Sequence, residues 1–165
     1  MQIGIFSDIH DNLENLKFAL DYFRFNKIET TVFCGDFCSP IPVRLMATFD
    51  TIQFHCIFGN NDGDRFTIET FTAKNARNIF IYGEYAELNF DERKIAVTHY
   101  PFYATALAEC KKYDAVFSGH THKSHVTFIE NCCWVNPGEL MAWLGNPSVA
   151  KYDTVSNQAH IIQLK

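Results

Sequence analysis

Ile3-Gly4-Ile5-Phe6-Ser7-Asp8-Ile9-His10 is an apolar run that leads directly into two side chains able to bind a metal ion. Short runs of β-branched and aromatic residues, bounded by glycine or polar residues, are typical of strands buried on both faces of a largely parallel sheet. Four later runs have the same form and are also followed by potential metal ligands; they are residues 31–34, 54–58, 95–97 and 115–117. The chain therefore repeats one unit, a buried strand followed by a nitrogen or oxygen donor.

Seven donors follow these five runs: Asp8, His10, Asp36, Asn60, His99, His120 and His122. In open α/β sheets the site lies beyond the carboxyl ends of the strands, so residues far apart in sequence meet there. Taken singly, each short motif is usually a turn or a surface segment. Together, and with a glycine directly before Asp36, Asn60 and His120, they favour one shared metal site, because a Cβ would clash where the backbone turns sharply into a site.

Length and composition predict a single domain over residues 1–165, since 165 residues with 47% hydrophobic and 20% charged side chains can bury one sizeable core. A net charge of −5 without a cluster of basic residues argues against a large nucleic-acid footprint. The opening residues lead directly into a strand that carries ligands, and no apolar run approaches the length of a membrane span. We therefore expect a cytoplasmic protein without a membrane segment.

The element order predicted from periodicity is β-α-β-α-β-α, followed mainly by strands. Asn12 is expected to cap a first helix, Pro42 to open a second, and residues 64–76 to form a third. A hairpin is expected around residues 91–93, and a fourth helix over residues 104–112. The last predicted strands are residues 125–130, 132–135, 149–155 and 159–164.

The same residues resemble the signature of the calcineurin-like metallophosphoesterases. The matching blocks are Asp8-Ile9-His10, Gly35-Asp36, Gly59-Asn60-Asn61-Asp62, Thr98-His99 and Gly119-His120-Thr121-His122, with Asn136-Pro137-Gly138 similar to a further turn of the smallest members. Length and the opening motif look most like the compact single-domain phosphodiesterase branch, which also contains the non-catalytic retromer scaffold subunit. The resemblance implies an α/β (α+β) fold of two packed β-sheets flanked by helices, an αββα sandwich, in which the second half of the chain supplies the second sheet.

The resemblance also implies a metal-dependent phosphodiesterase with a dinuclear centre, in which a bridging hydroxide attacks phosphorus in line. Asp8, His10 and His122 would hold one divalent ion, Asn60, His99 and His120 the other, and Asp36 would bridge them. Carboxylate, amide and imidazole donors suit divalent transition metals. Manganese is the favoured ion, with iron, nickel and zinc as alternatives.

Two positions depart from the family pattern. Asn61 stands where many members have a histidine that protonates the leaving group, so good leaving groups should be favoured, because an amide donates a hydrogen bond but does not give up a proton. Tyr100-Pro101 stands where the family usually has glycine, and we favour a loop-shaping role over one in the pocket. Asp62 is expected either to orient a ligand histidine or to cap a helix.

Three functions are open on the sequence. The first is the phosphodiesterase, acting on a small phosphoester. The second is a non-catalytic binding or scaffold module on the same fold, which the missing histidine and the 15% aromatic content allow. The third, a small nuclease, is disfavoured by the acidic balance. The oligomeric state is open, including a homodimer.

Overall fold

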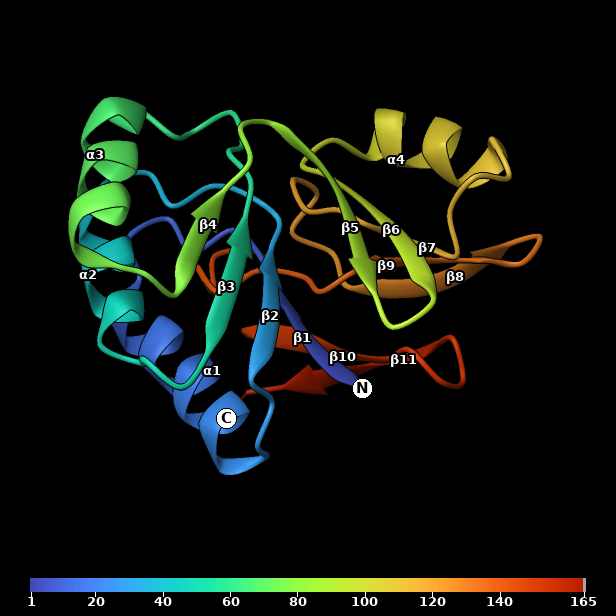
Figure 1. Ribbon diagram of the computed structural model, residues 1–165, viewed down its shortest axis with the longest axis horizontal. Helices are drawn as coiled ribbons and strands as arrows, with labels where there is room; N and C mark the ends of the chain where they lie inside the picture. Colours follow the sequence, from blue (N-terminus) through green and yellow to red (C-terminus); the bar gives the residue numbers. More distant parts are fainter. Residues whose placement is uncertain (165) are drawn as a thin grey trace.

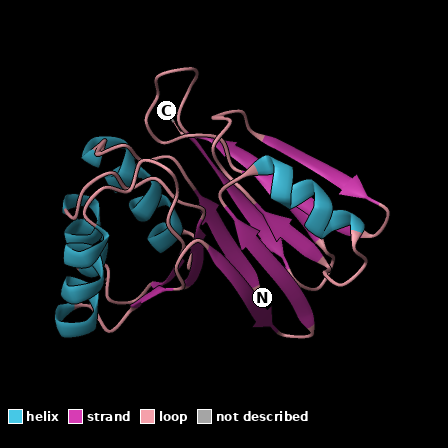
Figure 2. Cartoon of the chain, turned by 90° about the horizontal axis from the view of Figure 1, so that it is seen from above, coloured by secondary structure: helices cyan, strands magenta, loops and turns pink. Residues whose placement is uncertain are grey.

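Two β-sheets pack face to face in the computed structural model, which describes residues 1–164, and helices cover both outer faces (Figures 1 and 2). The order of layers is helix, sheet, sheet, helix. The expected αββα sandwich is confirmed.

The first sheet has the strand order β11-β10-β1-β2-β3-β4. Its parallel strands are β1 (Gln2–Phe6), β2 (Thr30–Phe33), β3 (Gln53–Cys56) and β4 (Ile79–Ile81). Strand β10 (Ser148–Asp153) pairs antiparallel with β1, with Ile3 opposite Tyr152, and β11 (Gln158–Gln163) pairs antiparallel with β10 at the edge of the sheet. The expectation that the second half of the chain builds only the second sheet was therefore wrong, because β10 and β11 return to cover the free edge of β1.

The second sheet has the strand order β5-β6-β7-β9-β8. Strands β6 (Arg93–Thr98), β7 (Ala115–Phe117) and β9 (Cys132–Asn136) are parallel to one another. The edge strands β5 (Tyr85–Phe90) and β8 (His125–Ile129) pair antiparallel with β6 and β9, which confirms the hairpin expected around residues 91–93. Ligand-bearing strands thus come from both sheets, and not from one continuous parallel sheet as the apolar runs suggested.

Three helices cover the first sheet: α1 (Leu13–Phe25), α2 (Ile41–Ala47) and α3 (Arg65–Asn75). The side chain of Asn12 accepts a hydrogen bond from the Asn15 N–H, so the predicted cap of α1 is confirmed. The fourth helix, α4 (Pro101–Glu109), covers the second sheet and begins three residues earlier than expected. The reason is Pro101, whose fixed φ and missing N–H suit the first turn of a helix.

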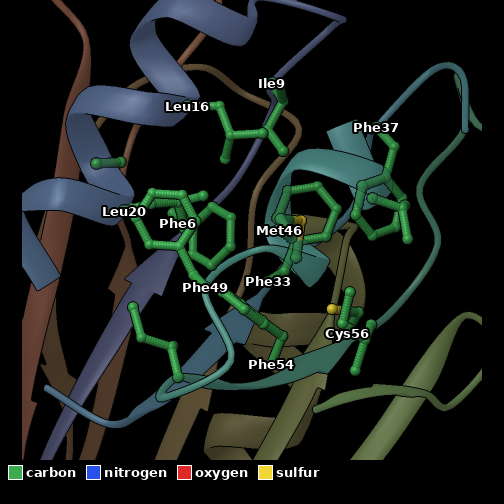
Figure 3. Close-up of a cluster of buried hydrophobic side chains, with 14 of the residues drawn as sticks. Phe6, Ile9, Leu16, Leu20, Phe33, Phe37, Met46, Phe49, Phe54 and Cys56 are labelled. Atoms are coloured by element: carbon green, nitrogen blue, oxygen red, sulfur yellow. The ribbon is translucent and has the colours of Figure 1, made fainter. Parts of the chain in front are cut away.

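Separate cores lie between the layers. Figure 3 shows the outer core of the first sheet, where Leu16 and Leu20 of α1 pack against Phe6, Phe33 and Phe54. A second core lies between the sheets and includes Ile3, Ile5, Val97, Phe117 and Tyr152, all fully buried. Because alternate residues of β1 enter the two cores, its register is fixed, and with it the position of the loop that follows. Within residues 1–164, no helix is long and apolar enough to span a membrane.

Candidate metal centre

The loops after β1, β2 and β3 of one sheet meet the loops after β6 and β7 of the other. Backbone hydrogen bonds link neighbouring loops within each sheet: the Asp8 N–H donates to the Gly35 carbonyl at 3.0 Å, and the Gly119 N–H donates to the His99 carbonyl at 3.2 Å. The Asp8 carboxylate also accepts from the His120 N–H at 3.1 Å. All seven expected donors are brought together at this junction of the two sheets.

A first donor group forms around the carboxylate of Asp8. Its Oδ1 lies 3.3 Å from His122 Nε2 and 3.8 Å from His10 Nε2. His10 Nε2 also lies 3.5 Å from Asp36 Oδ2. The donor atoms of Asp8, His10 and His122 all lie within 4.8 Å of one another, close enough to contact one ion.

A second donor group forms on the other side of Asp36. Its Oδ2 lies 3.3 Å from His99 Nε2. Asn60 Oδ1 lies 3.1 Å from His99 Nε2 and 2.8 Å from His120 Nδ1. Since Asp36 Oδ2 faces donors of both groups, it is the atom placed to be shared between two ions.

Two buried polar atoms of the first group meet no hydrogen-bond partner among residues 1–164: Asp8 Oδ1 and His10 Nε2. A buried polar atom without a partner is costly and needs an explanation. A cation between these donors would satisfy both. The donor chemistry and this pair of atoms fit divalent metal ions.

The histidine tautomers favour metal binding at the same atoms. His99 Nδ1 donates to the Cys34 carbonyl at 2.7 Å, which leaves Nε2 free to face Asp36. His122 Nδ1 lies 2.6 Å from the Glu139 carboxylate, which leaves Nε2 facing Asp8. Fixing a ligand histidine through its second nitrogen is a common feature of metal sites.

Strained backbone gathers at the candidate ligands. Five of them have a positive φ: Asp8 (52°), His10 (45°), Asp36 (69°), His120 (70°) and His122 (61°). A side chain makes this left-handed conformation unfavourable, and it persists where the surrounding structure enforces it, typically at functional sites. The loops therefore hold these five side chains in directions that a relaxed loop would not select.

The three glycines before ligand positions are required by close contacts. A Cβ on Gly35 would lie 2.7 Å from His99 Nδ1, and one on Gly119 would lie 2.7 Å from Asp8 Oδ2. A Cβ on Gly59 would overlap Asp36 Oδ1. The steric role expected for these glycines is confirmed.

Asp62 differs from its expected role. Its buried carboxylate accepts four backbone hydrogen bonds, from the N–H groups of Asp36, Phe37, Cys38 and Gly59. It neither orients a histidine nor caps α3, whose cap is Asp64. Asp62 ties the loop carrying Asp36 to the loop carrying Asn60, which are the loops on the two sides of the second donor group.

Glu139 was missed by the sequence analysis. It is 1% exposed, and besides His122 it accepts hydrogen bonds from the Leu144 and Gly145 N–H groups at 2.6 and 2.8 Å. The nearby Asn136 side chain donates to the Gly119 carbonyl at 2.8 Å and so supports the loop that carries His120. The only sequence signal was the Asn136-Pro137-Gly138 turn, which directly precedes Glu139.

Asn61 and Cys38 contact the donors from outside. Asn61 donates from its backbone N–H to Asp36 Oδ1 and from its side chain to Asp36 Oδ2, both at 2.8 Å. Cys38 Sγ lies 3.2 Å from His10 Nδ1. Asn61 therefore bonds to the central carboxylate, while its exposed position leaves it at the mouth of the site.

The electrostatics keep the carboxylates ionised. Burial alone raises the pKa of Asp8, but the adjacent His10 and His122 and the charge of His99 outweigh it, so the pKa lies below its ordinary value. Burial of Asp36 is likewise outweighed by His99 and Asn61, and its pKa is lowered. Asp8, with help from Glu139 and against partial burial, raises the pKa of His122 to about 9. The site therefore holds excess negative charge that attracts cations.

Tyr100 does more than shape a loop. It is the cap residue of α4, and its ring centroid lies 5.3 Å from that of His99 and 5.4 Å from that of His120. The expectation that Tyr100-Pro101 only shapes a loop was therefore incomplete, because Tyr100 forms a wall of the second donor group.

The sequence was compared with models of known protein families. A family model described as the calcineurin-like phosphoesterase superfamily domain matches residues 1–157. The chain belongs to this superfamily. Members of the superfamily depend on metal ions, and this chain's candidate binding residues include Asp8 with His10 and His122, and Asp8 with Asp36 and His99.

Individual relatives agree with the family. The phosphodiesterase MJ0936 of Methanocaldococcus jannaschii is 31% identical over 170 residues, covering 100% of both chains. The solved structure of an archaeal phosphodiesterase is similar with a TM-score of 0.89 and 29% identity, covering 99% of this chain and 100% of the other. Vps29 of Cryptosporidium parvum shares the fold with a TM-score of 0.67 and 17% identity, covering 98% and 95%.

Proposed function

We propose that this chain is a metal-dependent phosphodiesterase carried by one domain, residues 1–165. The observation that carries the proposal is the placement of Asp36 Oδ2 between two donor groups, 3.5 Å from His10 Nε2 and 3.3 Å from His99 Nε2. A carboxylate shared in this way holds two cations about 3.5 to 4 Å apart while offsetting their repulsion. The relationship to MJ0936, over the full length of both chains, supports phosphodiesters as the substrates.

Asp8, His10, His122 and Asp36 would hold one ion, and Asn60, His99 and His120, with Asp36, the other. Divalent ions bound there supply a Lewis acid that polarises phosphoryl oxygens and lowers the pKa of water. Manganese is the ion that we propose first, and the donor set equally allows iron, nickel and zinc. The location that we propose is cytoplasmic.

The chain's own residues provide positioning. The Asn61 side-chain amide donates one of its two hydrogens to Asp36 Oδ2. The second hydrogen can donate to a substrate oxygen. The Asn61 side chain cannot transfer a proton to the leaving group, because an amide does not ionise near neutral pH. The proposal therefore includes a preference for esters whose leaving group departs without protonation.

Activity of metal-loaded protein tests the proposal. The protein is stripped with a chelator, reloaded with manganese and assayed on bis(4-nitrophenyl) phosphate. We expect turnover that requires the metal and is lost in Asp36→Asn, while Asp21→Asn on the outer face of α1 stays fully active as the matched carboxylate control. Metal-loaded protein that hydrolyses no diester would contradict the proposal.

A scaffold module is the second candidate. Exposed aromatic side chains favour it, because Phe66 is 80%, Phe102 81% and Trp143 75% exposed. Aromatic side chains are enriched at protein interfaces relative to the rest of a protein surface. Calorimetry with manganese separates the candidates, since the scaffold alone predicts no tight metal uptake.

A further inference from the structure

An aromatic pocket adjoins the second donor group. It has a volume of about 420 Å³ and lies between the start of α4 and the strands β5 and β6. Its lining residues are Glu84, Tyr85, Thr98, Tyr100, Tyr103, Ala106 and Leu107. The pocket is thus walled mainly by tyrosine rings and small or apolar side chains.

The first turn of α4 supplies two of the tyrosines that line this pocket. Because Pro101 begins α4, Tyr100 stands at its cap and Tyr103 follows one turn later, so their side chains are neighbours. Their ring centroids lie 5.9 Å apart with the planes at 83°, an edge-to-face pair. Tyr103 is nevertheless 56% exposed, and Tyr85 is 40% exposed. Core packing therefore does not account for these two rings.

The pocket shares one wall, the Tyr100 ring, with the metal centre. The same ring that lines the pocket lies against His99 and His120, with centroids 5.3 and 5.4 Å away. Asn60 and His120 are both exposed, and His120 lies against the Tyr100 ring. A phosphoryl group at the second donor group therefore has one of its ester substituents beside the tyrosine wall.

The charge of the lining favours a neutral, flat substituent. The Glu84 carboxylate is already paired with Arg65 at 2.6 Å, and Arg65 also donates to the Gly59 carbonyl at 2.9 Å. The Tyr85 hydroxyl lies 2.7 Å from the Tyr113 hydroxyl. With these polar groups engaged, the ring faces and the hydroxyls of Tyr100 and Tyr103 remain as recognition elements, and ring faces bind other aromatic rings well.

We propose that this pocket binds an aromatic ring carried by one ester group of the substrate, so that the preferred substrates are phosphodiesters with an aryl group or a nucleobase. The inference rests on the proposed function for the position of the phosphoryl group. It assigns Tyr103 as a specificity-determining residue.

Matched pairs of phosphorus ligands test the pocket by binding, without turnover. Phenylphosphonate and methylphosphonate differ by the ring, as do thymidine 5′-phosphate and 2-deoxyribose 5-phosphate. Calorimetry of the manganese-loaded protein should show the ring-bearing member of at least one pair binding about threefold to tenfold tighter, the gain of one aromatic contact. The first pair reports an aryl group and the second a nucleobase.

Variants test whether Tyr103 causes the tighter binding of the ring-bearing ligands. Tyr103→Ala should remove it and leave the binding of the ring-free ligands unchanged, and Tyr103→Phe should keep it, because the ring face and not the hydroxyl is used. Trp143→Ala is the matched control, since Trp143 lies on the opposite rim beside His10 and His122. Circular dichroism checks that each variant is folded.

Equal binding within both pairs would overturn the inference, and so would a gain that survives Tyr103→Ala or disappears in Trp143→Ala. These outcomes are distinct from failure of the proposed function. A protein that binds the ring-bearing ligands through Tyr103 but hydrolyses no diester would retain the pocket and lose the phosphodiesterase.

Discussion

Replacing Asp62 by asparagine should destabilise the protein strongly, although the two side chains have nearly the same shape. Asp62 Oδ1 accepts from the N–H groups of Phe37 and Cys38 at 2.7 and 3.1 Å. Oδ2 accepts from those of Asp36 and Gly59 at 3.1 and 2.7 Å. An asparagine has one acceptor oxygen, so its amide nitrogen would face two N–H donors that have lost their partner.

The expected loss follows from these contacts. Hydrogen bonds to a charged group contribute roughly 1.5–3 kcal/mol each, so two of them correspond to about 3–6 kcal/mol. That is a large part of the roughly 5–15 kcal/mol that stabilises a typical domain. Because the bonds join the Asp36 and Asn60 loops, manganese affinity should fall in the same variant.

Urea denaturation followed by circular dichroism measures the free energy of unfolding. Asp64→Asn is the matched control, because Asp64 accepts one bond as the cap of α3 and asparagine is an equally good cap. We expect the control to change stability by less than about 0.5 kcal/mol. A loss below about 1 kcal/mol in Asp62→Asn would refute the assigned role.

Three further predictions concern the metal centre. Glu139→Gln should lower the pKa of His122 from about 9 toward its ordinary value, as measured by NMR titration. The same variant should bind metal roughly 10- to 100-fold more weakly in calorimetry, and unchanged affinity would count against the contact. Asp8 raises the pKa of His122 to about 9, and, against burial of its ring, the pKa of His99 is raised by Asp36. Since both imidazoles must be neutral to bind a metal, metal uptake at pH 7.5 should release protons and tighten as the pH rises toward 9; calorimetry in buffers of different ionisation enthalpy that shows no release would contradict this. Aryl diesters should turn over much faster than alkyl diesters, and Asn61→His should narrow the difference; equal initial rates for a matched pair would remove the basis of the Asn61 assignment.

The donors of the site could be predicted because their signal is local. Asp8, Asp36 and His99 each follow a short apolar run, and strand ends converge whichever sheet they belong to. The first three helices were also visible, since capping residues and apolar spacing depend on neighbours in sequence. The division of the strands between two sheets was not visible, because a buried strand has the same composition in either sheet.

Long-range contacts account for what sequence reasoning missed. Glu139 reaches His122 from 17 positions away, and Asp62 reaches the backbone of Asp36 from 26 positions away. Neither contact follows a periodic pattern in the sequence. The contact of Asp62 is with backbone N–H groups, which nearly every residue has, so residue types do not reveal it. The same holds for β10, whose pairing with β1 joins residues from opposite ends of the chain.

Anomalous X-ray diffraction from crystals soaked in manganese tests the central claim most directly. The account predicts two manganese peaks about 3.5 to 4 Å apart, both within bonding distance of the Asp36 carboxylate, with Asp8, His10 and His122 around one and Asn60, His99 and His120 around the other. A single peak, or two peaks that do not share Asp36, would contradict it.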